Sequence, residues 1–347
     1  MTEYFIALDV HCAFSEMAVV TGSGTLVRRE RLATTIPALR EAVSSVRRPR
    51  RLTFEEGPLA DWLARELRDC VNELVVSEPR RNHWIAKDGD KDDPLDAKKL
   101  ADLFRGGYLK PVHQADSLSR SLLKQHVALY HDRVGERVRQ GNQVLGLFRR
   151  HGVFLKTADL IDPEAYRLAL ERLPDPRLCR TGIGRVHDVF RLMLEQEEAL
   201  REELIGLAQN EEPVRRFREL PGFGWIRSVT FYVFVDTPWR FRSKSALWRY
   251  CGLGMERRHS GNGPVRTKLS KHGNRQLKNV LIGAAKSAIA QSDNPFADKF
   301  HSWIITGGNT PPAKRNVARA LATTLWGLWK NGERYDPRRI QTVKTER

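Results

Sequence analysis

Three short apolar runs at the start of the chain predict β-strands. They cover residues 4–10 (YFIALDV), 16–21 (EMAVVT) and 25–32 (TLVRRERL). Gly22 and Gly24 lie between the last two runs, where glycine supplies the backbone freedom that a tight turn requires. The pattern therefore predicts a meander in which each strand is followed closely by the next.

Alternating helices and strands are predicted after this meander. Helical spacing of apolar residues occurs in residues 37–46, 60–70 and 94–104, whereas residues 51–55 and 73–76 predict strands. The resulting order, β-β-β-α-β-α-β-α, is typical of the ribonuclease-H-like α/β architecture. It also fits the sugar-kinase and actin-like ATPase fold, so the order alone does not decide the function.

Two long amphipathic helices are predicted in the middle of the chain. Apolar residues recur near heptad spacing in residues 116–151, and a second such helix is expected in residues 185–209. Pro163, Pro174 and Pro176 lie between them and predict interruptions there, because proline disrupts the interior of a helix. The pair favours an antiparallel hairpin or a dimerising coiled coil. An ordinary helical bundle within one domain is the alternative interpretation.

The chain of 347 residues is long enough for two or three domains. We expect an α/β catalytic unit in residues 1–113 and a long-helix, coiled-coil region in residues 114–212. Residues 213–300 predict a basic, tryptophan-rich and mostly helical unit, and residues 301–347 a C-terminal helix with a polar tail. The expected fold class is α/β combined with all-α.

The net charge of +17 and the isoelectric point near 10.0 indicate a polyanionic partner. Nucleic acid is the usual one, because each phosphate contact by Lys or Arg releases bound counterions. An anionic membrane is disfavoured, since no amphipathic basic helix stands apart and no run of about 18 apolar residues occurs. The start of the chain also lacks a secretion signal, so we expect a cytoplasmic protein that works on the nucleoid.

Four acidic residues in the N-terminal unit form a candidate magnesium site. Asp9 lies in the first predicted strand, where an ionised carboxylate is costly without a cation or a donor. Glu55 ends the fourth predicted strand, and Glu56 beside it leaves the choice between them open. Asp93 and Asp96 are three residues apart at a helix start and share one face. Such oxygen ligands suit Mg²⁺ or Mn²⁺, although each residue taken singly also fits a helix cap or a solvated turn.

Several motifs along the chain resemble those of one family of mobile-element enzymes. The N-terminal ones are ALDVH, FEEGP and KDDPLDAKKLADLFRGG, and the C-terminal ones are ELPGFGWIRSVTFYVFV, FRSKSALWRYCGLG and RRHSGNGPVRTKLSKHGNRQLKNVLIGAA. They resemble the insertion-sequence-110 transposases, which carry a RuvC-like domain named for its Asp-Glu-Asp-Asp set and a C-terminal transposase domain. The resemblance extends from about Tyr4 to Gln291 and implies a DNA transposase or recombinase.

The resemblance also implies roles for single carboxylates. Asp9 and Glu55 match the first two metal-binding, catalytic carboxylates of the family. Asp93 and Asp96 match the closing pair, with Asp92 as a weaker competitor for Asp93.

A serine nucleophile in the C-terminal unit is implied in the same way. Ser260, in RHSGNG, is the matching position, and Ser270, in LSKHGN, is the alternative. A serine hydroxyl is a poor nucleophile at neutral pH, and Arg257, Arg258 and His259 could stabilise the charge that develops on the phosphate. Without the resemblance, the residues alone favour a glycine-rich surface turn at Ser260.

The C-terminal unit carries a dense set of basic residues. We expect the following side chains to contact phosphates rather than to read bases: Arg257, Arg258, Arg266, Lys268, Lys271 and Arg275. The Pro-Gly-x-Gly turn at Leu220–Ile226 fits a helix-hairpin-helix element, although a plain turn between helices also fits. Trp225, Trp239, Trp248 and Tyr250 are expected to be core residues.

The expected function is metal-dependent cleavage and rejoining of donor and target DNA during transposition. The resemblance implies that a structured non-coding RNA guides the enzyme and that the chain forms homo-oligomers, either dimers or tetramers. A RuvC-like structure-specific endonuclease without a covalent intermediate is the main alternative. An actin-like ATPase or kinase is disfavoured, because DVHCAFSE lacks the glycines of a phosphate-binding loop. A non-catalytic RNA-binding protein would leave the acidic set without a role.

Overall fold

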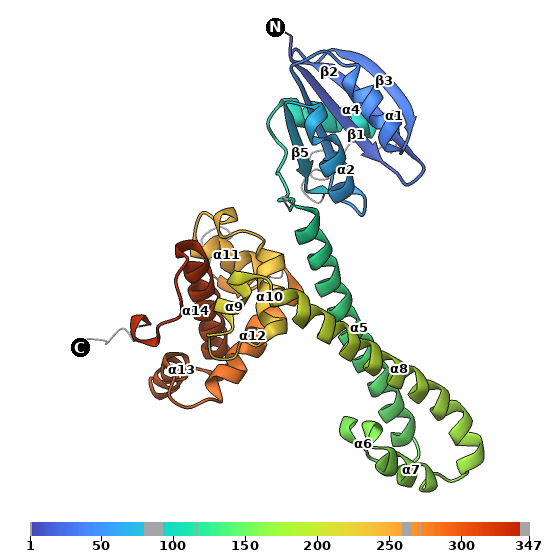
Figure 1. The fold of residues 1–347 in the computed structure, drawn as a ribbon, viewed down its shortest axis with the longest axis vertical. Helices are drawn as coiled ribbons and strands as arrows, with labels where there is room; N and C mark the ends of the chain where they lie inside the picture. Colours follow the sequence, from blue (N-terminus) through green and yellow to red (C-terminus); the bar gives the residue numbers. More distant parts are fainter. Residues whose placement is uncertain (1, 80–92, 116, 259–265, 271, 341–347) are drawn as a thin grey trace. The chain divides into compact units, whose positions relative to one another are not determined.

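The computed structural model describes residues 2–79, 93–115, 117–258, 266–270 and 272–340. It is a mixed α/β structure in which helices predominate, and the chain divides into two compact units, Met1–Ser117 and Leu118–Arg347 (Figure 1). The buried apolar clusters each lie within one unit or the other. None of the helices in the described ranges combines the length and the apolar character that crossing a lipid bilayer requires.

A five-stranded sheet forms the centre of the N-terminal unit. Its strands lie in the order β3-β2-β1-β4-β5. Their bounds are Tyr4–Val10 (β1), Phe14–Thr21 (β2), Leu26–Ala33 (β3), Arg50–Glu55 (β4) and Glu73–Ser77 (β5). The pairs β1–β2 and β2–β3 are antiparallel, whereas β4 is parallel to β1 and β5 is parallel to β4. The predicted meander and the two later strands are thus confirmed.

Helices cover both faces of this sheet. Alternate residues of a strand point to opposite faces, and Ile6, Leu8 and Leu52 pack with α1 (Ile36–Ser44) and α2 (Ala60–Leu67). A short 3₁₀ turn, η1 (Arg68–Cys70), follows α2.

The opposite face of the sheet packs against the helix α4 (Asp93–Arg105). Phe5, Ala7 and Val20 contact this helix, which buries Leu100, Ala101 and Phe104 there. Figure 1 shows α1 and α2 beside the sheet and α4 behind its first two strands.

Two long helices open the C-terminal unit and pack along each other. They are α5 (Leu118–Arg149) and α8 (Pro176–Ala208), with the short helices α6 (Thr157–Ile161) and α7 (Pro163–Glu171) between them. Arg137 of α5 and Glu197 of α8 form a largely buried ion pair with Nε and Oε2 2.5 Å apart.

Two of the three prolines between the long helices start helices. Pro163 and Pro176 are the first residues of α7 and α8, and the side chains of Asp162 and Asp175 cap these helices. Proline fits the first helical position because the N–H it lacks has no partner there. The second long helix therefore begins at Pro176 and not at residue 185, so that predicted boundary was wrong.

The remaining elements form one helical core with a small β-hairpin. They are α9 (Glu212–Phe217), α10 (Trp225–Val235), η2 (Pro238–Arg240), α11 (Lys244–Tyr250), β6 (Met255–Arg258), β7 (Arg266–Leu269), α12 (Arg275–Ile289), α13 (Pro295–Ile305), α14 (Thr310–Asn331) and η3 (Pro337–Arg339). Leu123 of α5 and Leu204 of α8 are buried in the same cluster. The long helices are thereby joined to the C-terminal core.

One glycine fixes the turn that precedes α10. Gly222 has a φ of +82°, and a Cβ added to it would lie 2.2 Å from the carbonyl oxygen of Ala284 in α12. The turn and α12 can pack this closely only because residue 222 has no side chain.

We predict that Gly222→Ala lowers the free energy of unfolding of the C-terminal unit by about 3 kcal/mol or more, from backbone strain and overpacking. Gly224→Ala is the matched control, because φ at Gly224 is negative and nothing lies near its added Cβ. We expect that change to cost less than about 1 kcal/mol. Chemical denaturation followed by tryptophan fluorescence measures both, and equal losses would contradict the packing constraint.

Candidate active site

Asp9 and Glu55 lie at the carboxyl ends of two neighbouring parallel strands. β1 pairs with β4 so that Leu8 is opposite Phe54, and both of these side chains are fully buried in the same cluster. The next residue on each strand must point to the other face. Asp9 and Glu55 therefore lie side by side on the face that α4 covers.

A cleft of about 300 Å³ opens at these strand ends. Its lining comes from the end of β1 and the following turn, and from the β4–α2 connection: Asp9, Val10, His11, Cys12, Phe54, Glu55, Glu56, Gly57, Pro58, Leu59, Ala60 and Leu63. The carboxyl ends of parallel strands are where α/β sheets bind their ligands. The two carboxylates are thus accessible, because the Asp9 side chain is 31% exposed and Glu55 is exposed as well.

His11 is a further polar residue of this cleft that the sequence reasoning missed. Its Nε2 lies 3.2 Å from Oδ2 of Asp9, and its ring packs on Phe14 with centroids 4.8 Å apart. The sequence held a signal for it, because residues two apart along a strand project to the same side. His11 holds one oxygen of Asp9 in a defined position.

A third carboxylate on the same face was also missed. Glu16 is the register partner of Asp9 across β1 and β2, and its side chain is only 4% exposed. Arg31 of β3 pairs with it, with Nε and Oε1 2.5 Å apart. A local cation therefore compensates this buried carboxylate, whereas Asp9 and Glu55 face the cleft.

The last two predicted carboxylates are on α4. Asp93 is its first residue, and its side chain lies outside the described residues. Asp96 follows in the first turn, with its side chain 44% exposed and Oδ1 3.9 Å from Nζ of Lys99. The described lining of the cleft does not include Asp96. Within the part of the chain that the structure describes, three or more metal-ligating side chains do not come together.

The predicted residues of the C-terminal unit fall on and around the β6–β7 hairpin. Its strands are antiparallel, with Arg258 opposite Arg266. Ser260 and Lys271 lie outside the described residues, as do the side chains of Arg257, Arg258 and Arg266. Lys268 on β7 and Arg275 at the start of α12 are described and exposed.

Ser270 is buried at the end of this hairpin. The residue is only 6% exposed, and its side-chain hydroxyl donates a hydrogen bond to the carboxylate of Glu256 on β6. The same oxygen accepts from the backbone N–H of His272 at 3.2 Å. The hydroxyl thus links the two strands to the segment before α12.

Two more residues of the LSKHGN run join α11 to α12. A Cβ added to Gly273, whose φ is +128°, would lie 2.6 Å from the carbonyl oxygen of Arg249. Asn274 caps α12 by accepting from the N–H of Leu277 at 2.9 Å, and Leu277 is fully buried. The described residues of this run therefore have packing and capping roles.

The positive charge of the chain concentrates around these elements. Residues 237–292 contain twelve Lys or Arg and one acidic residue, Glu256, which gives +11 of the net +17. Exposed members of the set include Arg242, Lys244 and Arg249. A surface with so little compensating negative charge suits phosphate groups.

The aromatic residues expected in the core behave differently from one another. Trp248 and Tyr250 pack against the core and donate hydrogen bonds to Thr323 Oγ1 at 3.0 Å and to the Phe234 carbonyl at 2.8 Å. Trp225 also packs against it. Trp239 is 70% exposed, so the expectation that it is a core residue was wrong.

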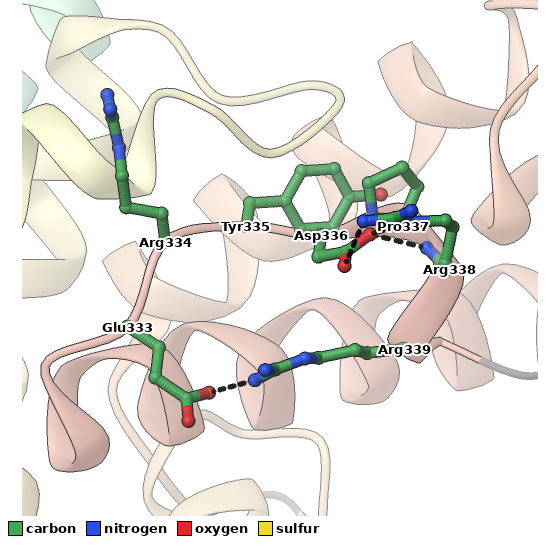
Figure 2. A pocket seen from close by; sticks show the side chains of 7 residues that line it. All are labelled: Glu333, Arg334, Tyr335, Asp336, Pro337, Arg338 and Arg339. Carbon is green, nitrogen blue, oxygen red and sulfur yellow. Dashed lines mark hydrogen bonds and ion pairs between the residues drawn. The ribbon is translucent and has the colours of Figure 1, made fainter.

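A second pocket lies near the end of the described chain (Figure 2). Three of its lining residues are arginines, and each has a carboxylate partner. Arg338 pairs with Asp336 at 3.0 Å and Arg339 with Glu333 at 2.8 Å, as Figure 2 shows, while Arg334 pairs with Glu219. These pairs neutralise the pocket, so it is a weak candidate for binding phosphate.

Comparison with known families identifies both units. Residues 6–152 match the family described as Transposase, of the DEDD type of IS110, and residues 214–302 match the Transposase IS116/IS110/IS902 family. Asp9, Glu55, Asp93 and Asp96 fall in the first match and Ser260 falls in the second.

Three curated relatives are similar over most of the chain. The transposase for insertion sequence element IS1111A of Coxiella burnetii is 26% identical over 71% of this chain and 68% of its own length. The putative transposase y4pF/y4sB of Sinorhizobium fredii is 25% identical over 78% of this chain and 70% of its own length. The transposase for insertion sequence element IS1328 of Yersinia enterocolitica is 21% identical over 77% of this chain and 78% of its own length.

Proposed function

Because this chain belongs to the IS110 family of transposases, we propose that it cuts and rejoins DNA with a divalent-metal site in its N-terminal unit and a serine nucleophile in its C-terminal unit. One observation carries the proposal: Asp9 and Glu55 lie near the carboxyl ends of adjacent parallel strands, face the same side of the sheet and line one cleft. A fold that only buried its core would not need two carboxylates side by side at this point, because their mutual repulsion is costly.

The strand arrangement supports a RuvC-like, ribonuclease-H-like catalytic domain in residues 1–113. Three antiparallel strands are extended on one side by β4 and β5, which run parallel to β1. In this arrangement β1 is central, so a residue at its end can be reached from β4 and from a helix packed on the same face. Asp9 occupies that position.

The metal site we propose combines Asp9, Glu55, Asp93 and Asp96. Asp93 is the first residue of α4, the helix that packs against β1, and Asp96 follows in its first turn. Glu55 is preferred over Glu56 because its register places it beside Asp9. These hard oxygen donors fit Mg²⁺ or Mn²⁺. When bound, such an ion offsets the negative charge that builds up at the scissile phosphate.

Replacing a proposed ligand should stop strand cleavage and leave DNA binding intact. We expect Asp9→Asn and Asp96→Asn to lower the cleavage rate by at least about 100-fold, because a metal contributes several kcal/mol to the transition state. Asp102→Asn is the matched control on the same helix, where Asp102 pairs with Lys98 at 2.9 Å. Cleavage of end-labelled DNA in Mg²⁺ measures the rates, and EDTA should act like Asp9→Asn. Cleavage that survives both would refute the metal site.

Ser260 is the nucleophile we propose in the C-terminal unit. Its hydroxyl oxygen would attack the phosphorus, form a phosphoserine ester and release the deoxyribose hydroxyl, and the hydroxyl of a second strand would reverse the step. The buried position of Ser270 supports this choice, because a phosphodiester must approach the attacking oxygen in line. The hydroxyl of Ser270 is also engaged with Glu256 and His272.

Ser260→Ala should remove the covalent protein–DNA adduct, and Ser270→Ala should retain it. Denaturing gel electrophoresis after incubation with labelled DNA and Mg²⁺ detects the adduct directly. An adduct lost only in Ser270→Ala would move the nucleophile to that residue. Metal-dependent cleavage without an adduct in the unchanged protein would favour a RuvC-like structure-specific endonuclease.

Donor and target DNA are the proposed substrates, and a structured non-coding RNA is the proposed guide. The basic surface around α11, β7 and α12 supports contacts to either polyanion, with the Leu220–Ile226 turn as a helix-hairpin-helix-like phosphate contact. Exposed Leu122 and Leu129 on α5 and Leu192 on α8 support self-association into dimers or tetramers. We propose that the protein works on the nucleoid.

RNA that co-purifies with the protein should contain one discrete, structured species. Part of that species should pair with DNA beside the gene, because the protein itself offers charge rather than base-reading side chains. Sequencing of the bound RNA tests this. A random sample of cellular RNA would contradict the proposed guide. The metal site would be unaffected by that result, because strand cleavage tests it separately.

A further inference from the structure

Trp239 lies open to solvent, unlike Trp225, Trp248 and Tyr250, which pack against the C-terminal core. It is the middle residue of η2 and is 70% exposed. A tryptophan normally contributes to stability by burying its large apolar surface. At this position the indole ring instead remains available to a partner.

The turn that carries Trp239 is held in place from several sides. Trp326 of α14 donates its indole N–H to the carbonyl of Pro238 at 2.6 Å. Arg240 donates to the carbonyl of Phe234 at 3.1 Å, and its guanidinium lies 4.2 Å from the ring centroid of Tyr250. A ring presented by such a fixed turn loses little conformational entropy when it binds.

Positive charge lies beside the exposed ring. The ammonium of Lys330 lies 4.9 Å from the ring centroid of Trp239 and 4.8 Å from that of Trp326. Exposed Arg242 and Lys244 follow the turn in the sequence. The helix α14, which packs against η2, contains four basic residues and no acidic one. An aromatic face beside uncompensated cations matches a partner that has flat rings on a chain of phosphates.

We infer that Trp239 is a stacking platform for an unpaired base of the DNA strand, with Lys330 bound to the adjoining phosphate. The inference rests on the proposed function, which makes DNA the substrate. Bases inside a duplex are stacked on one another and cannot reach the indole, whereas strand exchange requires the duplex to open locally. The ring therefore recognises the opened strand and is indifferent to its sequence, since every base has a flat π-face.

Binding of the full chain to single-stranded and duplex DNA tests this inference. The probes are fluorescein-labelled oligothymidylate of about 20 nucleotides, a duplex of equal length and the corresponding oligouridylate, all in EDTA so that no cleavage occurs. Trp239→Ala should weaken binding of the oligothymidylate by at least about five-fold and that of the duplex by less than about two-fold. Trp239→Phe should restore most of the loss, because a phenyl ring still stacks.

Two control variants separate stacking from other causes. Trp303→Ala removes another exposed tryptophan, 47% exposed on α13, and should leave both affinities unchanged. Lys330→Gln should weaken single-strand binding. It should also make the plot of log affinity against log salt concentration less steep by about one unit, because one phosphate contact is lost. Equal losses for single strand and duplex, no loss at all, or a loss confined to oligouridylate would overturn the inference.

The metal site and the stacking platform fail independently in these assays. Asp9→Asn should bind oligothymidylate like the unchanged protein, because the assay contains no metal. Normal binding by Trp239→Ala together with inactive Asp9→Asn would refute the platform and leave the proposed function intact. Weak single-strand binding by Trp239→Ala together with active Asp9→Asn would support the platform and refute the metal site.

Discussion

The parallel register between β1 and β4 is the constraint on which the candidate active site depends. Leu8 and Phe54 are opposite each other and are buried in the same cluster, so hydrophobic packing fixes the register. A shift of one residue would turn the apolar side chains of β4 away from α2 and carry Glu55 with them. The same packing that stabilises the sheet therefore sets two carboxylates side by side. Strand β2 adds the buried carboxylate of Glu16, which pairs with the exposed Arg31 of β3, and α4 begins at Asp93.

In the C-terminal unit, some residues shape the surface and others give it its charge. Gly222 and Gly273 allow the turns before α10 and α12 to approach other backbone closely. Ser270 and Asn274 supply hydrogen bonds that hold the segment before α12. The segment that contains most of this frame, residues 237–292, carries twelve Lys or Arg and a single acidic residue. The frame gives the surface its shape, and the excess charge gives it affinity for polyanions.

Much of the fold could be predicted from the sequence because its patterns are local. Apolar runs and helical spacing identified the five strands and both long helices. The start of α8 was missed because proline both breaks helices and begins them, and only the capping aspartate before Pro176 distinguishes the two cases. Trp239 was placed in the core because composition does not reveal which tryptophan a short turn will expose.

For the candidate site, the sequence identified residue types better than their surroundings. Asp9 and Glu55 stood out as carboxylates at strand ends, yet their adjacency follows from strand pairing, which no local pattern specifies. Glu16 was missed for the same reason, since its relation to Asp9 depends on the pairing of β1 with β2. His11 was missed although it follows Asp9 by only two residues, a spacing that can place both side chains on one side. The roles of Asp93 and Ser260 rest on the family to which the chain belongs.

The central claim is that Asp9 and Glu55 hold one divalent ion between them. Anomalous diffraction from crystals grown with Mn²⁺ locates such an ion without reference to activity. We predict a manganese peak in the cleft at the ends of β1 and β4, with carboxylate oxygens of both residues about 2.2 Å away. Manganese bound elsewhere, with Asp9 and Glu55 contacting only protein groups and water, would contradict the claim.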